Sequence, residues 1–173
     1  MNVLELFKPI KAFVLDVDGV LTDGSLLIMP DGEWVRRMNI KDGYVLQLAV
    51  KKGYHVFVIS GAVSKPVMQR LQRLGVKEVY NGISNKKELL LKLMQQYNLI
   101  KEQVLYMGDD IPDYEAMQAA GLLTCPADAV AEIKQICQYI SPVKGGEGCV
   151  RDVMEKVMKL NNHWEADTSV ASQ

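Results

Sequence analysis

The chain has 173 residues, 49% of them hydrophobic and 24% charged, and its 20 basic and 21 acidic residues leave a formal net charge of −1. A chain of this length is one domain with a modest remainder, and it buries roughly 70% of the surface that its unfolded form exposes, so it folds without disulfides or a structural metal. A charge so close to zero excludes general attraction to nucleic acid or to an anionic membrane, so any bound anion is held by local groups.

Short apolar runs alternate with helical patterns along most of the chain. Continuous apolar runs, typical of strands buried on both faces, occupy residues 12–16, 55–60, 104–108 and 121–124. Apolar residues at helical spacing lie between these runs. Strands that alternate with helices predict an α/β fold of Rossmann-like type, with three layers (α/β/α), a central parallel sheet and right-handed crossovers.

Residues 24–38 interrupt this alternation. Two apolar segments, LLIM and WVRRM, flank Pro-Asp-Gly, which predicts a β-hairpin inserted after the first strand. The four consecutive apolar residues 26–29 need cover on both faces of their strand, which favours packing of hairpins against one another in a homo-oligomer. A hairpin that is buried locally in a monomer is the alternative.

The remaining spacing predicts the domain organisation. The hairpin and one helix fill the chain between Gly19 and Ser60, and two helices and a strand fill the chain between Gly61 and Asp109, so neither interval has room for a cap domain. We therefore expect a single domain over residues 1–160. The polar, aperiodic residues 161–173 predict a mobile C-terminal tail.

The most informative motif, DVDGVLTDG, follows the first predicted strand. Asp16 and Asp18 lie two residues apart on a turn that Gly19 makes permissive, and such a pair can divide the roles of nucleophile and general acid/base. An acidic turn that caps a following segment is the alternative. A calcium loop is excluded, because Val20 and Leu27 occupy positions where that loop needs oxygen ligands.

A second acidic motif, MGDDIPD, follows a later buried strand. Asp109 and Asp110 open a helix and Asp113 lies one turn further on, and helix capping explains one or two of these residues. Parallel strands bring this motif to the same edge of the sheet as Asp16 and Asp18, where two carboxylates 4 Å apart repel by about 4 kcal/mol at an effective dielectric constant near 20. The crevice therefore needs a cation, and Mg²⁺ is favoured over Zn²⁺ because no His or Cys lies in these segments.

Two weaker motifs lie between the acidic ones. Ser60 and Gly61 place a hydroxyl and a backbone N–H at a strand end, which is typical of a small anion cradle but also of an ordinary turn. Lys86 and Lys87 open a predicted helix, where a solvated pair of charges is the alternative interpretation.

This order of carboxylate pair, hydroxyl, lysine and carboxylate pair resembles the haloacid dehalogenase superfamily of phosphotransferases. The resemblance implies that Asp16 is the nucleophile and Asp18 the general acid/base, and that Ser60, with Gly61 beside it, and Lys86 hold the phosphoryl oxygens. It also implies that Mg²⁺ is ligated by Asp16, Asp109 and the backbone carbonyl of Asp18. Lys86 is chosen over its neighbour because it ends the YxGxSxK pattern of this superfamily, and Asp110 and Asp113 are expected to support the metal site.

Over roughly residues 8–158 the chain is similar to the 3-deoxy-D-manno-octulosonate 8-phosphate phosphatase family, through the hairpin, NIKDGY at 39–44 and KGGEGCVRDV at 144–153. The resemblance implies hydrolysis of a 2-keto-3-deoxy sugar acid phosphate through an aspartyl-phosphate. It also implies a homotetramer, in which neighbouring subunits are expected to complete each site. Arg70, on the predicted helix after the Ser-Gly motif, and Arg151, in the matched terminal element, are candidate contacts to the sugar carboxylate. Ala62 stands where this family often carries arginine, so a phosphatase for a nine-carbon ulosonate 9-phosphate remains an alternative.

Two other classes of protein compete with this interpretation. A receiver-type signalling domain also uses an aspartyl-phosphate and Mg²⁺ on a parallel sheet, but it lacks the DxDG turn. A catalytically silent subunit is disfavoured by the intact set of acidic, hydroxyl and lysine residues. The three cysteines form no CxxC motif and the N-terminus shows no cleavable apolar segment, which predicts reduced thiols and a cytoplasmic location.

Overall fold

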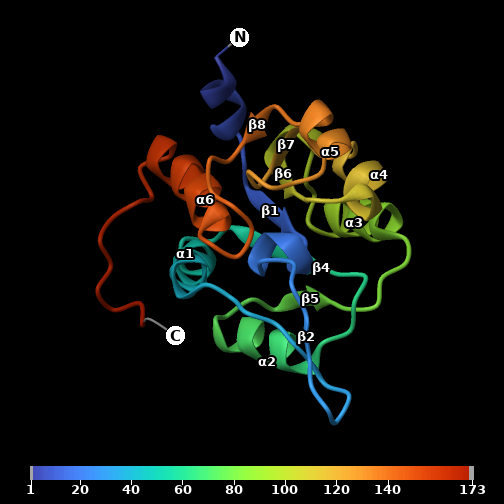
Figure 1. Cartoon of the computed structure of the whole chain (residues 1–173). Coiled ribbons are helices and arrows are strands. Elements are labelled where there is room, and N and C mark those ends of the chain that lie inside the picture. Colours follow the sequence, from blue (N-terminus) through green and yellow to red (C-terminus); the bar gives the residue numbers. More distant parts are fainter. Residues whose placement is uncertain (1, 172–173) are drawn as a thin grey trace.

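The computed structural model describes residues 2–171 and contains a six-stranded sheet in the order β5-β4-β1-β6-β7-β8 (Figure 1). The strands are β1 (Ala12–Leu15), β4 (His55–Ile59), β5 (Glu78–Tyr80), β6 (Val104–Met107), β7 (Leu122–Cys125) and β8 (Tyr139–Ile140). All neighbouring strands in this sheet are parallel. The predicted parallel α/β sheet is thus confirmed.

Helices cover both faces of the sheet, which gives the three predicted layers (Figure 1). The α-helices are α1 (Ile40–Lys51), α2 (Lys65–Arg73), α3 (Lys86–Gln96), α4 (Tyr114–Met117), α5 (Ala131–Ile136) and α6 (Cys149–Leu160). Short helical turns occupy Val3–Phe7, Val17–Leu21, Lys101–Gln103 and Ile111–Asp113. Helices α1, α2 and α6 share one core cluster, and α3, α4 and α5 share the other.

The alternation of side chains along β1 explains why both faces are buried. Phe13 and Leu15 belong to the core cluster under α1, α2 and α6, whereas Ala12 and Val14 belong to the opposite cluster. All four side chains are at most 1% exposed. A continuous apolar run is therefore the pattern expected of a central parallel strand.

Local residues explain where several helices begin and end. The side-chain oxygens of Asn39 and Asn85 accept hydrogen bonds from backbone N–H groups in the first turns of α1 and α3. Pro66 lies in the first turn of α2, where its missing N–H costs no intrahelical bond. Gly75 follows the end of α2 with a φ of 86°, a conformation that favours glycine.

The predicted hairpin is present as a two-stranded antiparallel pair outside the main sheet. Its strands, β2 (Leu27–Ile28) and β3 (Trp34–Val35), are only two residues long, and a bridge between Thr22 and Met38 closes its base. The hairpin extends away from the layers (Figure 1). No cap domain interrupts the described part of the chain, as predicted.

The segment expected to be a mobile tail lies against α1. Lys51 Nζ is 2.5 Å from Asp167 Oδ2, and the Tyr44 hydroxyl donates to the Asp167 carbonyl oxygen at 3.2 Å. The Trp164 ring meets the Tyr44 ring edge-on at 6.2 Å between centroids. These contacts are those of a packed segment, and its last two residues lie outside the described chain. No described helix combines the length and the apolar character required to cross a membrane.

Candidate active site

The carboxyl ends of β1, β4 and β6 border a cavity of about 380 Å³. Its lining residues are Asp16, Asp18, Gly24, Ser60, Gly61, Ala62, Ile83, Ser84, Lys86, Asp109, Asp110, Pro112 and Asp113. Parallel α/β sheets place their ligands at this edge. The cavity therefore brings together the two acidic motifs, the Ser-Gly motif and the lysine that the sequence singled out.

The turn after β1 is shaped by a glycine and a threonine. Gly19 has a φ of 87°, and a Cβ atom at this position would lie 1.9 Å from Asp109 Oδ2. The Thr22 hydroxyl accepts hydrogen bonds from the N–H groups of Gly19 and Gly24, each at 3.2 Å. Residue 19 must be glycine for the Asp16–Asp18 turn to approach Asp109 this closely.

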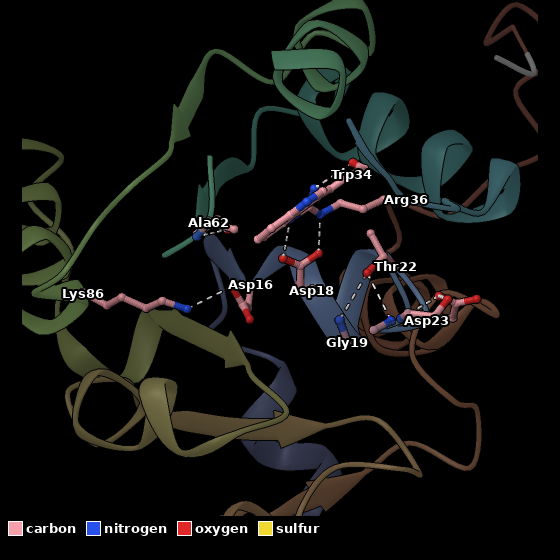
Figure 2. Close-up of polar contacts among 12 residues, drawn as sticks. Asp16, Asp18, Gly19, Thr22, Asp23, Trp34, Arg36, Ala62 and Lys86 are labelled. Carbon is pink, nitrogen blue, oxygen red and sulfur yellow. Dashed lines mark hydrogen bonds and ion pairs between the residues drawn. The ribbon is translucent and has the colours of Figure 1, made fainter. Parts of the chain in front are cut away.

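Lys86 lies at the centre of a buried network of charges. From the first turn of α3, its Nζ donates to Asp16 Oδ1 at 2.9 Å and to Asp113 Oδ1 at 2.8 Å. Asp16, Lys86 and Asp113 are only 8%, 6% and 1% exposed. The hydroxyl of Tyr106, which lies on β6, also donates to Asp113 Oδ1, at 2.9 Å. Asp113 therefore anchors the lysine that faces Asp16, a more central place than the supporting one the sequence assigned (Figure 2 shows Lys86 and Asp16).

Burial shapes the titration of this network. Burial first, and then the charge of Asp113, raise the pKa of Asp16 to about 7, against the opposing effect of Lys86. Burial, followed by Asp16 and Asp113, raises the pKa of Asp109 to about 7. Burial lowers the pKa of Lys86, but Asp113 and Asp16 outweigh it, so the pKa of this lysine is raised and it stays charged. The one positive charge of Lys86 cannot neutralise the carboxylates of Asp16, Asp109 and Asp113 when all three are ionised.

The donor set fits a hard divalent cation. Carboxylate oxygens of Asp16, Asp109 and Asp113 all lie within 4.8 Å of one another. Asp109 Oδ1 is buried and accepts no hydrogen bond from any residue that the structure describes. An unpartnered buried carboxylate oxygen is costly unless a further positive group binds it, and an all-oxygen set is what Mg²⁺ prefers.

Ser60 directly follows β4 and lines the same cavity. Its side chain is nearly buried, and its hydroxyl oxygen accepts a hydrogen bond from the N–H of Ala62 at 3.2 Å. The Ser60 carbonyl accepts from the N–H of Ile83 at 3.0 Å, which fixes the strand end beside Lys86. The hydroxyl, the loop backbone and the lysine together can hold an anion such as a phosphoryl group.

Asp18 has a partner that the sequence did not identify. Arg36, which follows β3, donates from Nε to Asp18 Oδ1 at 2.6 Å and from Nη2 to Asp18 Oδ2 at 3.1 Å (Figure 2). The hairpin thus reaches back to the turn that follows β1. Nothing in the WVRRM segment distinguished this arginine from its neighbour Arg37, which pairs with Asp23.

The structure does not bring Arg70 or Arg151 to this cavity. Arg70 lines a second, larger cavity of about 760 Å³, which hairpin residues and α2 enclose. Arg151 pairs with Glu155 at 3.2 Å and lies over the rings of Tyr44 and Trp164, 5.3–5.4 Å from the centroids. Within one chain, neither arginine faces the carboxylates.

The glycine-rich element that contains Arg151 instead supports the turn that follows β1. The N–H of Gly146 donates to the Val20 carbonyl at 3.0 Å, and a Cβ atom on Gly145 would lie 1.9 Å from the Gly19 carbonyl oxygen. The buried Asp42, from NIKDGY, accepts at 2.8 Å from the N–H of Arg151. The two outlying motifs therefore meet each other and hold the backbone of the first motif.

Three comparisons with known proteins, by family model, by protein sequence and by solved structure, indicate the same kind of hydrolase. The family model of haloacid dehalogenase-like hydrolases matches residues 42–127. The 3-deoxy-D-manno-octulosonate 8-phosphate phosphatase of Escherichia coli (strain K12) is 33% identical over 157 residues, which cover 91% of this chain and 84% of the relative.

Solved structures of the same kind are also similar. The 3-deoxy-D-manno-octulosonate 8-phosphate phosphatase of Yersinia pestis superposes with a TM-score of 0.91 at 30% identity, covering 95% of this chain and 89% of that one. The enzyme of that name from Moraxella catarrhalis, in complex with magnesium ion, phosphate ion and KDO, has a TM-score of 0.89 at 30% identity, and the match covers 94% of each chain.

Proposed function

The chain belongs to the 3-deoxy-D-manno-octulosonate 8-phosphate phosphatases among the haloacid dehalogenase-like hydrolases, and from this premise we propose that it hydrolyses that sugar phosphate to the free sugar acid and phosphate. One observation carries the proposal. Asp16 reaches the cavity at the end of β1 with Lys86 bound to one oxygen, beside Asp109, whose buried oxygen has no described partner.

The first half-reaction transfers the phosphoryl group to the protein. An oxygen of Asp16 attacks phosphorus in line, and the bond between phosphorus and the sugar oxygen breaks. Asp18, in its acid form, gives its proton to the departing sugar oxygen. The products of this step are an aspartyl-phosphate at Asp16 and the free sugar acid.

The second half-reaction releases phosphate. Asp18, now a carboxylate, takes a proton from a water molecule as the water oxygen attacks phosphorus. The bond between phosphorus and the Asp16 oxygen breaks, which restores the carboxylate and leaves inorganic phosphate. Asp18 is again protonated, so the cycle balances.

The remaining groups hold and neutralise the phosphoryl oxygens. The cofactor is Mg²⁺, which offsets charge on the phosphoryl group when it is bound. We assign its ligands as Asp16, Asp109 and the backbone carbonyl of Asp18, with Asp110 as a supporting residue. Lys86 and Ser60 bind the phosphoryl oxygens, and Asp113 keeps Lys86 in place.

A nine-carbon ulosonate 9-phosphate is the second candidate substrate. Ala62 lines the cavity, so position 62 offers no cation to the sugar, which supports keeping this alternative. Steady-state rates of phosphate release with the eight-carbon and nine-carbon sugar phosphates, in the presence of Mg²⁺, test the choice. Equal rates on an unrelated phosphomonoester would argue against both.

We also propose a homotetramer in the cytoplasm. Large apolar side chains of the hairpin are exposed, and Arg70 and Arg151 lie outside the cavity of their own chain, which supports their action on a neighbouring subunit. The three cysteines are free thiols, in keeping with a reducing compartment. A single-chain mass in light scattering at micromolar concentration would contradict the assembly.

A further inference from the structure

Arg36 lies between the two cavities. It lines the larger cavity, and it holds Asp18, which lines the smaller one. Its side chain is only 4% exposed, although the hairpin that carries it is largely exposed. Its third nitrogen, Nη1, donates to the Trp34 carbonyl at 3.3 Å. All three guanidinium nitrogens are therefore engaged, two of them by Asp18.

This pairing conflicts with the chemistry assigned to Asp18. Each Asp18 oxygen accepts a hydrogen bond from one nitrogen of the same guanidinium. A bidentate pair of this kind fixes the orientation of both partners. Asp18 has to be protonated before it can pass a proton to the sugar oxygen, and a neutral carboxyl group cannot keep both charge-assisted hydrogen bonds to Arg36, so the pair has to loosen once in each turnover.

The substrate class offers a group that can open the pair. A 2-keto-3-deoxy sugar acid phosphate carries a carboxylate in addition to its phosphate, and a guanidinium binds either carboxylate in the same bidentate geometry. Exchange of one carboxylate for another keeps the number of charge-assisted hydrogen bonds constant. A neutral sugar phosphate offers no such replacement and leaves Arg36 on Asp18.

We propose that Arg36 is a latch on Asp18 that the carboxylate of the substrate releases. This inference rests on the proposed function. The latch makes proton transfer by Asp18 depend on an acidic sugar, so it selects the substrate through the catalytic step. Arg36 is in this sense a positioning residue and a determinant of specificity.

The test compares an acidic and a neutral substrate in matched variants. Phosphate release with Mg²⁺ is measured on 3-deoxy-D-manno-octulosonate 8-phosphate and on glucose 6-phosphate for the wild type, Arg36→Gln and Arg36→Lys. In Arg36→Gln, kcat/KM for the acidic sugar relative to the neutral one falls about 10- to 100-fold, the scale of a charge-assisted hydrogen bond, and kcat for the neutral sugar rises. Arg36→Lys retains part of the wild-type preference for the acidic sugar phosphate over the neutral one.

Arg37→Gln is the control. Arg37 is the next residue, but its side chain is 70% exposed and pairs with Asp23 instead of Asp18. This variant leaves the ratio at the wild-type value. Circular dichroism confirms that all variants are folded.

Two results would overturn the latch. An equal fall of kcat on both substrates in Arg36→Gln would mean that Arg36 only orients Asp18, and an unchanged ratio would mean that the pair has no part in selection. Failure of the proposed function is a separate outcome, because it is seen in the wild type alone as no phosphate release from the acidic sugar phosphate.

Discussion

The carboxylate–lysine centre (Asp16, Lys86, Asp109 and Asp113) and the hairpin differ sharply in how well a single chain buries and pairs their side chains. In the centre, Asp113 is 1% and Lys86 6% exposed, and Lys86 has two carboxylate partners. In the hairpin, Leu27 and Ile28 are 63% and 67% exposed, and Trp34 is 58% exposed. Polar groups are buried and apolar groups are exposed, the reverse of the usual arrangement.

This reversal shows what each region lacks. Buried charges persist only when partners surround them, and two carboxylate oxygens of the centre, Asp109 Oδ1 and Asp113 Oδ2, have no partner among the described residues, which favours binding of a cation. A cluster of exposed apolar side chains on one element is typical of a surface that contacts another molecule. The centre lacks a further cation, and in the assembly that we propose the hairpin lacks the surface of a neighbouring subunit.

Asp16→Asn gives the largest expected effect. Asparagine keeps the size of the side chain but cannot form the acyl phosphate, so kcat falls by about 10⁴-fold or more, the scale seen when a covalent catalyst loses its nucleophile. Phosphate release with Mg²⁺ measures the loss, and cooperative thermal unfolding shows that the fold is intact. Substantial phosphatase activity in a folded variant would refute the assignment of the nucleophile.

Lys86→Met tests whether the centre depends on its single buried cation. The variant leaves Asp16 and Asp113 buried without their shared partner, and breaking a buried pair in this way costs about 3–5 kcal/mol of unfolding free energy. Urea denaturation measures the change.

Lys87→Met is the matched control for that experiment. Lys87 is the next residue on α3, its side chain is 45% exposed, and it contacts Glu115 only at 3.4 Å. A surface pair contributes about 0–1 kcal/mol, so this variant unfolds close to the wild type. Equal destabilisation by the two substitutions would mean that the network around Lys86 contributes nothing special to stability.

The stabilisation of the folded protein by Mg²⁺ is expected to depend on pH, which tests whether the carboxylate–lysine centre binds the ion. The pKa of Asp16 and that of Asp109 are each raised from 3.8 to about 7 in the folded metal-free protein, so the folded state binds more protons than the unfolded state between these values. The unfolding free energy of the metal-free protein therefore falls as the pH rises from about 4 to 7. Binding of Mg²⁺ at pH 8 opposes this loss, whereas at pH 5 protons compete with the ion.

The expected readout is a thermal shift. At a concentration one hundred times its dissociation constant, an ion that binds only the folded state adds about 2.7 kcal/mol, or roughly 5–10 °C for a chain of this size. The rise is expected at pH 8 and is much smaller at pH 5. Asp109→Asn is the control, because it removes a proposed ligand. A rise that is independent of pH, or that persists in Asp109→Asn, would place the ion elsewhere.

The sequence predicted the centre better than its surroundings, for a physical reason. Asp16, Ser60, Lys86 and Asp109 follow strand ends or open helices, and parallel topology brings such positions together whatever the details of packing. The sequence analysis did not identify Tyr106, because this residue lies within an apolar strand run and is expected there to be an ordinary core side chain. Only the structure shows that its hydroxyl donates to Asp113.

Other contacts depend on geometry that no local pattern encodes. Strand β8 is two residues long, too short for a periodicity to appear. The role of Gly145 requires knowing that its backbone meets the Gly19 carbonyl, and the placement of Arg36 depends on how far the hairpin folds back over the turn. Arg151 matched a motif, yet its side chain packs on aromatic rings.

The hairpin gives the smallest expected effect on the stability of one chain. In the double variant Leu27→Ser and Ile28→Ser, both changed side chains are exposed, so the unfolding free energy of the isolated chain changes by no more than about 0.5 kcal/mol. The mass in solution responds instead. We expect light scattering to show dissociation toward a single chain of 19.4 kDa, because the hydroxyl groups remove the apolar surface that we propose as the contact between subunits.

Leu91→Ser separates this effect from a general loss of surface apolarity. Leu91 lies on α3 and is 49% exposed, so the substitution is chemically the same but falls outside the hairpin, and the assembly stays intact. If the hairpin variant keeps the mass of the wild type, the hairpin is as self-sufficient as the carboxylate–lysine centre, and its exposed apolar residues need another explanation. If only the hairpin variant dissociates and also loses turnover of the sugar acid phosphate, the active site depends on a neighbouring subunit. That subunit would supply the substrate contacts, such as Arg70 or Arg151, that lie outside the cavity of their own chain.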